Sequence, residues 1–107
     1  MTLHVHRIAL EAIAELRPIV ARIRKHDRDL ANQLRRAASS MALNIGEAAY
    51  SDPGTSRSRF HSAAGSANET RTALLVAIAW GYVGEAHAAS ANELLDRAIG
   101  MLWRLTH

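Results

Sequence analysis

The feature that most constrains this chain is an apolar stripe with helical spacing between positions 30 and 48. At about 100° per residue, the apolar side chains of this stretch fall on one face of a helix. They are Leu30, Leu34, Ala37, Ala38, Met41, Ile45 and Ala48. The pattern therefore predicts a helix with one side in a hydrophobic core.

The opposite face of this helix carries a second regular stripe. Arg36, Ser40, Leu43 and Glu47 recur at i, i+4, i+7 and i+11. On a monomer, the outward face of a helix usually carries mostly long charged side chains. Because serine and leucine interrupt the charges here, we expect the helix to be covered on two sides, by its own bundle and by something else.

Similar apolar stripes predict three further helices, over about residues 3–24, 53–80 and 85–105. Turn signals separate them: Asp27 can cap the second helix, Asp52-Pro53 can start the third, and Gly81 can end it. The 107 residues suffice for one core. With such short links we expect an all-α, antiparallel up-down-up-down four-helix bundle that forms a single domain over residues 1–107.

Arg71 falls on the face of the third helix that the stripe turns inward. A charge on that face needs a partner, because a buried unpaired charge is costly. Glu11, Glu15 and Glu47 are all candidates, and the sequence does not choose between them.

Gly65 and Ser66 lie in the middle of the third helix, where glycine costs about 1 kcal/mol relative to alanine. We expect a close approach of another helix backbone to compensate. Trp80, Tyr82 and Trp103 stand in apolar runs, so we assign them to the core or to an interface rather than to platforms for nucleobases.

Basic residues gather in the first half of the chain. The formal net charge is +3, and seven basic residues face two acidic ones between positions 17 and 36. Such a cluster favours phosphate backbones through counterion release, although a merely solvated face is the alternative. The candidates for phosphate contacts are Lys25, Arg28, Arg35, Arg57 and Arg59.

The sequence gives little support to a catalytic or metal-binding function. No glutamate is followed by a histidine three or four residues later, so the di-iron pattern of helical bundles is missing, and there is no cysteine or glycine-rich phosphate loop. We therefore predict no catalytic residue, no metal site, no cofactor and no enzymatic activity. The layout of a signal peptide and a long apolar segment are both missing, so we expect a cytoplasmic protein with no membrane partner.

Four motifs together resemble a known family. They are QLRRAASS at residues 33–40, NIGE at 44–47, AAGS with Glu69 at 63–69, and WGYV at 80–83. They are similar to the four-helix-bundle proteins encoded in intervening sequences of bacterial 23S ribosomal RNA genes. More distantly, they resemble the accessory variability protein of diversity-generating retroelements, which binds nucleic acid and a reverse transcriptase. The chain departs from the family pattern at Gly46 and at residues 56–59.

The resemblance implies an up-down bundle, a homopentamer, no enzymatic activity and a nucleic-acid role. Our first hypothesis is a non-catalytic pentamer that binds the RNA or DNA backbone through the five basic residues named above. The alternative is a protein–protein adaptor, for example for a reverse transcriptase, with no direct nucleic-acid role. Polar contacts within or between subunits are assigned to Arg36, Ser40, Leu43, Asn44, Glu47, Gly65, Ser66 and Glu69.

Overall fold

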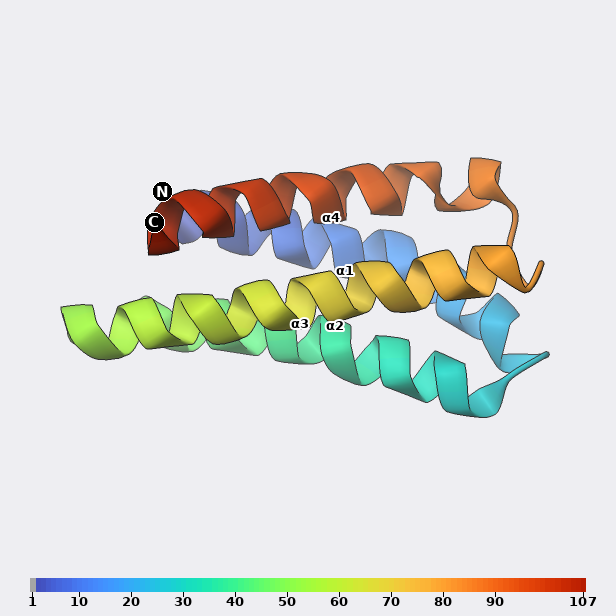
Figure 1. The fold of residues 1–107 in the computed structure, drawn as a ribbon, viewed down its shortest axis with the longest axis horizontal. Helices are drawn as coiled ribbons and strands as arrows, with labels where there is room; N and C mark the ends of the chain where they lie inside the picture. Colours follow the sequence, from blue (N-terminus) through green and yellow to red (C-terminus); the bar gives the residue numbers. More distant parts are fainter. Residues whose placement is uncertain (1) are drawn as a thin grey trace.

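The computed structural model describes the backbone of residues 2–107 and the side chains of residues 4–107. Its helices are α1 (Thr2–Arg24), α2 (Arg28–Ala48), α3 (Pro53–Ala79) and α4 (Glu85–Thr106). They run alternately up and down, as the colour sequence of the ribbon in Figure 1 shows. The predicted all-α, antiparallel up-down-up-down bundle is confirmed.

The helices close into a four-cornered arrangement. Each packs against its neighbour in chain order, and α4 packs back against α1. The bundle is 42 Å long and 22 by 20 Å across. The α1–α2 and α3–α4 turns lie together at one end, here called the α1–α2 end (Figure 1). The α2–α3 turn and the last turn of α4 lie at the other, here called the α2–α3 end.

Both predicted helix starts are confirmed by their capping hydrogen bonds. The Asp27 carboxylate accepts the backbone N–H of Leu30 at an N···O distance of 2.9 Å, and α2 begins at the next residue after Asp27. The Asp52 carboxylate accepts the backbone N–H of Thr55 at 3.0 Å and its hydroxyl at 2.9 Å. Pro53, the first residue of α3, has no N–H to leave unpaired. Each cap satisfies donors that the first helical turn cannot pair.

Gly81 ends α3 as predicted. It has a φ of 79°, in the left-handed region that glycine adopts without strain. The N–H of Tyr82 donates to the carbonyl of Ala77, and the N–H of Gly81 donates to that of Ile78, both at 2.9 Å. These two bonds form a Schellman motif, which reverses the chain between α3 and α4.

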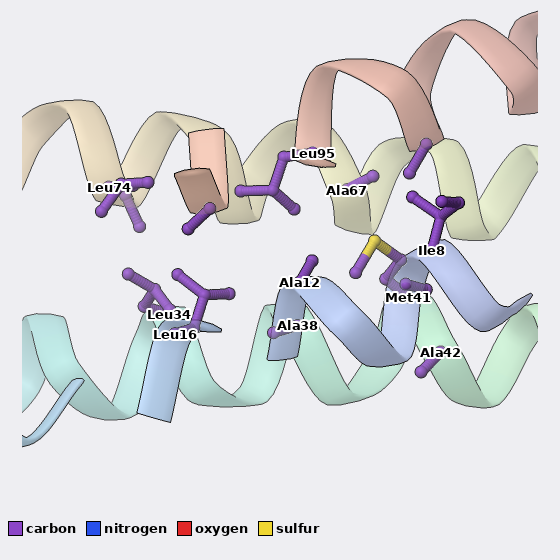
Figure 2. Close-up of a cluster of buried hydrophobic side chains, with 14 of the residues drawn as sticks. Ile8, Ala12, Leu16, Leu34, Ala38, Met41, Ala42, Ala67, Leu74 and Leu95 are labelled. Atoms are coloured by element: carbon purple, nitrogen blue, oxygen red, sulfur yellow. The ribbon is translucent and has the colours of Figure 1, made fainter. Parts of the chain in front are cut away.

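The core lies along the axis between the four helices. Figure 2 shows Leu16, Leu34, Met41, Leu74 and Leu95 pointing toward one another from all of them. Each of these side chains is at most 2% exposed. All seven residues of the predicted α2 stripe are buried, so that prediction is confirmed. Removing each large apolar side chain from water contributes about 1.5–3 kcal/mol, which is what holds the helices together.

The stripe predicted for α3 was partly wrong. The apolar spacing of the third helix predicts Phe60, Ala64, Ala67, Leu74 and Ile78 on the inward face. Phe60, Ala67 and Leu74 are buried, but Thr70 occupies the inward position next to the one assigned to Arg71. The Thr70 hydroxyl donates to the carbonyl of Ser66 at 2.7 Å, so its only side-chain polar atom is satisfied within the helix. The inward face is therefore turned toward Thr70 but still includes three residues of the predicted stripe.

Arg71 consequently lies at the edge of the α3–α4 contact. Its guanidinium forms an ion pair with Asp96 at 2.7 Å and donates to the Asn68 side chain at 3.1 Å. None of the three candidate glutamates is its partner. Asp96 belongs to α4, which packs beside α3. The sequence alone does not show which helix lies beside α3, so it could not identify Asp96 as the partner.

The two tryptophans are not in the core. Trp80 is 70% exposed and Trp103 is 59% exposed, which excludes the core, while their assignment to an interface stays a prediction. Tyr82 is half-buried against the core. Over the described residues, no helix combines the length and apolar content needed to cross a bilayer.

Candidate functional site

A groove between α1 and α2 gathers basic side chains. Arg17 and Arg24, two helical turns apart on α1, and Arg35 on α2 line a surface cavity of about 340 Å³. A spacing of seven residues places side chains on one face of a helix, which is why both α1 arginines reach the groove. The floor is apolar, with Val20 and Ala38 among its residues, and no acidic side chain lines it. We call this surface the basic groove.

Two more predicted basic residues continue the basic groove at the α1–α2 end. Lys25 lies in the turn after α1, and Arg28 is the first residue of α2. Both side chains are exposed, as is that of Arg35. Within residues 4–107, none of these three side chains forms a hydrogen bond or ion pair with the chain. Their charges are therefore available to an external anion.

The groove on the other side of α1 has the opposite character. Glu11 and Glu15 on α1 and Glu93 on α4 line a cavity of about 430 Å³ that no basic residue lines. The Ser90 hydroxyl donates to the Glu15 carboxylate at 2.6 Å. Charge is thus separated across α1, with acids toward α4 and bases toward α2. Such separation gives the bundle one side that attracts anions.

Arg57 and Arg59 lie away from the basic groove, near the α2–α3 end. The Arg57 guanidinium donates to the backbone carbonyl of Thr106 at 2.9 Å, at the C-terminal end of α4, where the helix dipole favours a cation. The Arg59 guanidinium forms an ion pair with Glu47 at 2.9 Å and approaches the Asn44 side-chain oxygen at 3.4 Å. Both arginines therefore have partners inside the chain.

A polar network joins α2 to α3. The hydroxyls of Ser40 and Ser66 share a hydrogen bond of 2.8 Å across the two helices. The Asn44 amide donates to the Ser40 carbonyl at 2.9 Å and reaches its hydroxyl at 3.3 Å, and the Asn44 oxygen is the one that faces Arg59. Glu47 completes the network through Arg59. Residues that the sequence grouped as polar contacts are therefore brought together within one subunit.

The outer face of α2 and α3 beside this network is open. Leu43 is 64% exposed, and Arg36, Gly65 and Glu69 are exposed as well. A Cβ added at Gly65 would meet nothing within 4 Å, so the predicted close approach of another helix is not made within the chain. We call Arg36, Leu43, Glu47, Gly65 and Glu69 the outer α2–α3 face.

Sequence reasoning missed one member of the basic groove and did not commit to another as a site residue. Arg17 was not singled out, although its spacing of seven residues from Arg24 was a usable signal, and Arg24 was counted only in the wider basic cluster between positions 17 and 36. Among residues 4–107, no three His, Asp or Glu side chains are arranged to hold a metal ion. The pKa of the Asp52 carboxyl is lowered because the backbone N–H and the hydroxyl of Thr55 donate to it. That group caps α3 and lies outside the basic groove.

Comparison with known proteins identifies the chain. The family model of the 23S rRNA-intervening sequence protein matches residues 1–104. The chain belongs to this family. This 23S rRNA-intervening sequence family member also resembles a solved structure from Bacteroides thetaiotaomicron, described as a protein with unknown function from the S23 ribosomal protein family. The TM-score is 0.85 at 21% identity, over 95% of this chain and 97% of the other, which supports the shared fold alone. A search of curated proteins finds no match.

Proposed function

We propose that this family member is a non-catalytic homo-oligomer that binds the backbone of RNA or DNA through the basic groove. The observation that carries the proposal is the cluster of Arg17, Arg24 and Arg35 around one cavity that no acidic residue lines. Three cations facing one groove repel one another, and a bound polyanion relieves that repulsion while releasing its own counterions. Lys25 and Arg28 extend the path for a second stretch of phosphates.

RNA is the first ligand to test, because the family description refers to 23S rRNA. Phosphate contacts fix position without reading sequence, so binding through the basic groove should be weakly sequence-specific. Arg57 and Arg59 were also expected to contact phosphate. Both also have partners inside the chain, through which they hold α3 against α4 and α2. Their contact with phosphate stays a prediction.

Self-association is the second part of the proposal. The outer α2–α3 face presents the exposed Leu43 and the open surface at Gly65, a combination that suits another helix better than it suits water. We propose that copies of this chain meet there and form a homopentamer. The basic groove lies on the other side of α2, so it would remain accessible in such an assembly.

The test of nucleic-acid binding is a double charge reversal, Arg17→Glu with Arg35→Glu. Arg97→Glu with Arg104→Glu is the matched control, because both residues are exposed on α4 and the change in net charge is the same. Binding of a structured RNA and a duplex DNA is measured at several salt concentrations. In the groove variant we expect affinity to fall and the slope of log K against log salt to decrease by about 2.

Equal losses in the two double variants would mean that only net charge matters, and would contradict the basic groove as the site. No binding by the unmodified protein even at low salt would contradict the nucleic-acid function itself. The exposed outer α2–α3 face would then favour the adaptor role, in which a protein partner such as a reverse transcriptase occupies the surface.

A further inference from the structure

A stack of rings stands at the α1–α2 end, where the basic groove opens. The rings of His26 and Tyr82 are parallel within 5°, with centroids 5.2 Å apart. The rings of Tyr82 and Trp80 are parallel within 16°, with centroids 6.4 Å apart. Three side chains from two different turns therefore present nearly parallel rings. We call His26, Trp80 and Tyr82 the ring stack.

The Schellman motif of α3 creates this arrangement. Trp80 and Tyr82 flank Gly81, whose positive φ reverses the chain. The reversal brings the two aromatic side chains side by side and lets Val83 pack into the core, where it is 3% exposed. Tyr82 is half-buried and thus anchors the stack, whereas the Trp80 side chain is 70% exposed. The Trp80 indole therefore faces solvent beside a partly buried ring that lies nearly parallel to it.

The exposure of so large an aromatic ring suggests that a ligand covers it. Left in water, a ring of this size loses the gain of about 1.5–3 kcal/mol that burial of a large apolar side chain provides. The residues around the ring stack indicate which kind of ligand would cover it. Lys25 precedes His26 in the chain and Arg28 follows two residues later, so cations border the ring stack. The acid between them, Asp27, is engaged in capping α2.

Parallel rings beside flexible cations match the chemistry of single-stranded nucleic acid. Unpaired bases offer flat faces that stack on aromatic side chains, and their phosphates meet nearby Lys and Arg. A duplex offers such faces only at its ends. We propose that the ring stack is a platform for unpaired nucleobases and that Lys25 and Arg28 lead the same strand into the basic groove. This inference rests on the proposed nucleic-acid function and adds a preference for single strands.

Trp103 provides a matched control at the opposite end of the bundle. It is also exposed, at 59%, but the His107 ring stacks on it with centroids only 3.4 Å apart, and no part of the basic groove lies near the α2–α3 end. Trp103→Phe should therefore leave strand binding unchanged. It also leaves Trp80 as the one tryptophan in the chain, because the sequence contains two.

The experiment uses the Trp103→Phe protein, a short oligothymidylate and an abasic strand with the same number of phosphates. Stacking on Trp80 should quench its fluorescence with the oligothymidylate and not with the abasic strand. Trp80→Leu should weaken binding of the oligothymidylate by about 5- to 150-fold, the range expected for one stacked base, without altering binding of the abasic strand. Trp80→Phe, which keeps a ring, should restore most of the affinity.

Equal affinity of Trp80→Leu and unmodified protein for the oligothymidylate would overturn the platform while leaving backbone binding intact. Failure of both strands to bind would remove the proposed function and the platform with it. Light scattering on the same variants tests whether a second copy of the chain, rather than a nucleic acid, covers the ring stack. If Trp80→Leu lowers the molar mass of the assembly, a second copy of the chain covers the ring stack, and the platform is wrong.

Discussion

Gly65→Ala tests the outer α2–α3 face more sharply than any loss of a side chain. Gly65 lies inside α3, is exposed, and a Cβ there would meet nothing within 4 Å. Alanine should therefore stabilise the isolated subunit by about 1 kcal/mol through helix propensity alone. At an unfolding entropy of about 2.1 cal/mol/K per residue, 107 residues give about 0.22 kcal/mol/K, so the melting temperature should rise by about 4–5 °C.

Assembly should respond in the opposite direction. If copies meet at the outer α2–α3 face, glycine allows close approach of two helix backbones, and a methyl group pushes them apart. We expect Gly65→Ala to melt at a higher temperature in dilute solution, where subunits are separate. At high concentration it should have a lower molar mass by light scattering than the unmodified protein. One substitution thus separates the stability of the subunit from that of the assembly.

Gly100→Ala is the control. Gly100 lies inside α4, away from the outer α2–α3 face, and its added Cβ would approach only the end of the Arg104 side chain, at 4.0 Å. It should raise the melting temperature by a similar amount and leave the molar mass unchanged. An unchanged molar mass for Gly65→Ala at every concentration would refute its place in an interface. A lower melting temperature in dilute solution would refute the open surroundings on which the reasoning depends.

Two further predictions concern stability. Asp52→Asn keeps an N-cap of similar strength but removes a carboxyl whose pKa is lowered by hydrogen bonds from Thr55. A group with a lowered folded-state pKa stabilises the protein above its unfolded pKa, and that contribution is lost as the pH falls below about 4. Urea unfolding should thus show a smaller loss of stability in acid for Asp52→Asn, and identical acid slopes would contradict the cap. For Ser40→Ala and Ser66→Ala, a double-mutant cycle should give a coupling of about 0.5–1.5 kcal/mol, whereas strictly additive losses would contradict the hydrogen bond between them.

The parts of the fold that the sequence predicted well are those decided locally. The α2 stripe is strongly periodic, so all its members could be assigned to the core from spacing alone. The caps at Asp27 and Asp52 and the turn at Gly81 follow from backbone chemistry within a few residues. None of these features depends on which helix packs beside which.

The errors lie where the outcome depends on neighbours. The second half of α3 is apolar on nearly every side, so its inward face could not be fixed, and Arg71 was assigned to it in place of Thr70. Trp80 and Trp103 were assigned to the core or to an interface because their flanks are apolar. A position at the end of a helix leaves them in solvent instead, since no fifth element covers those ends in the described residues.

The sequence predicted only part of the candidate site, because side-chain partners on other helices cannot be read from local spacing. Lys25, Arg28 and Arg35 were named from charge density along the chain. Arg35 lines the basic groove, and Lys25 and Arg28 lie in and just after the α1–α2 turn. Arg57 and Arg59 lie in the first two turns of α3, where the helix dipole disfavours cations. Within the chain, their guanidinium groups meet the carbonyl of Thr106 and the carboxylate of Glu47, which belong to other helices that sequence spacing does not locate.

The adjacent arginines Arg35 and Arg36 show how α2 can serve two surfaces at once. Consecutive residues of a helix point about 100° apart. Arg35 therefore lines the basic groove beside α1, while Arg36 belongs to the outer α2–α3 face. Because the core stripe separates the groove positions from the Ser40 and Asn44 network, a change on one side need not disturb the other. A bundle built this way can join copies through one side of α2 and keep its cations free on the other, so the two proposed roles compete for no residue.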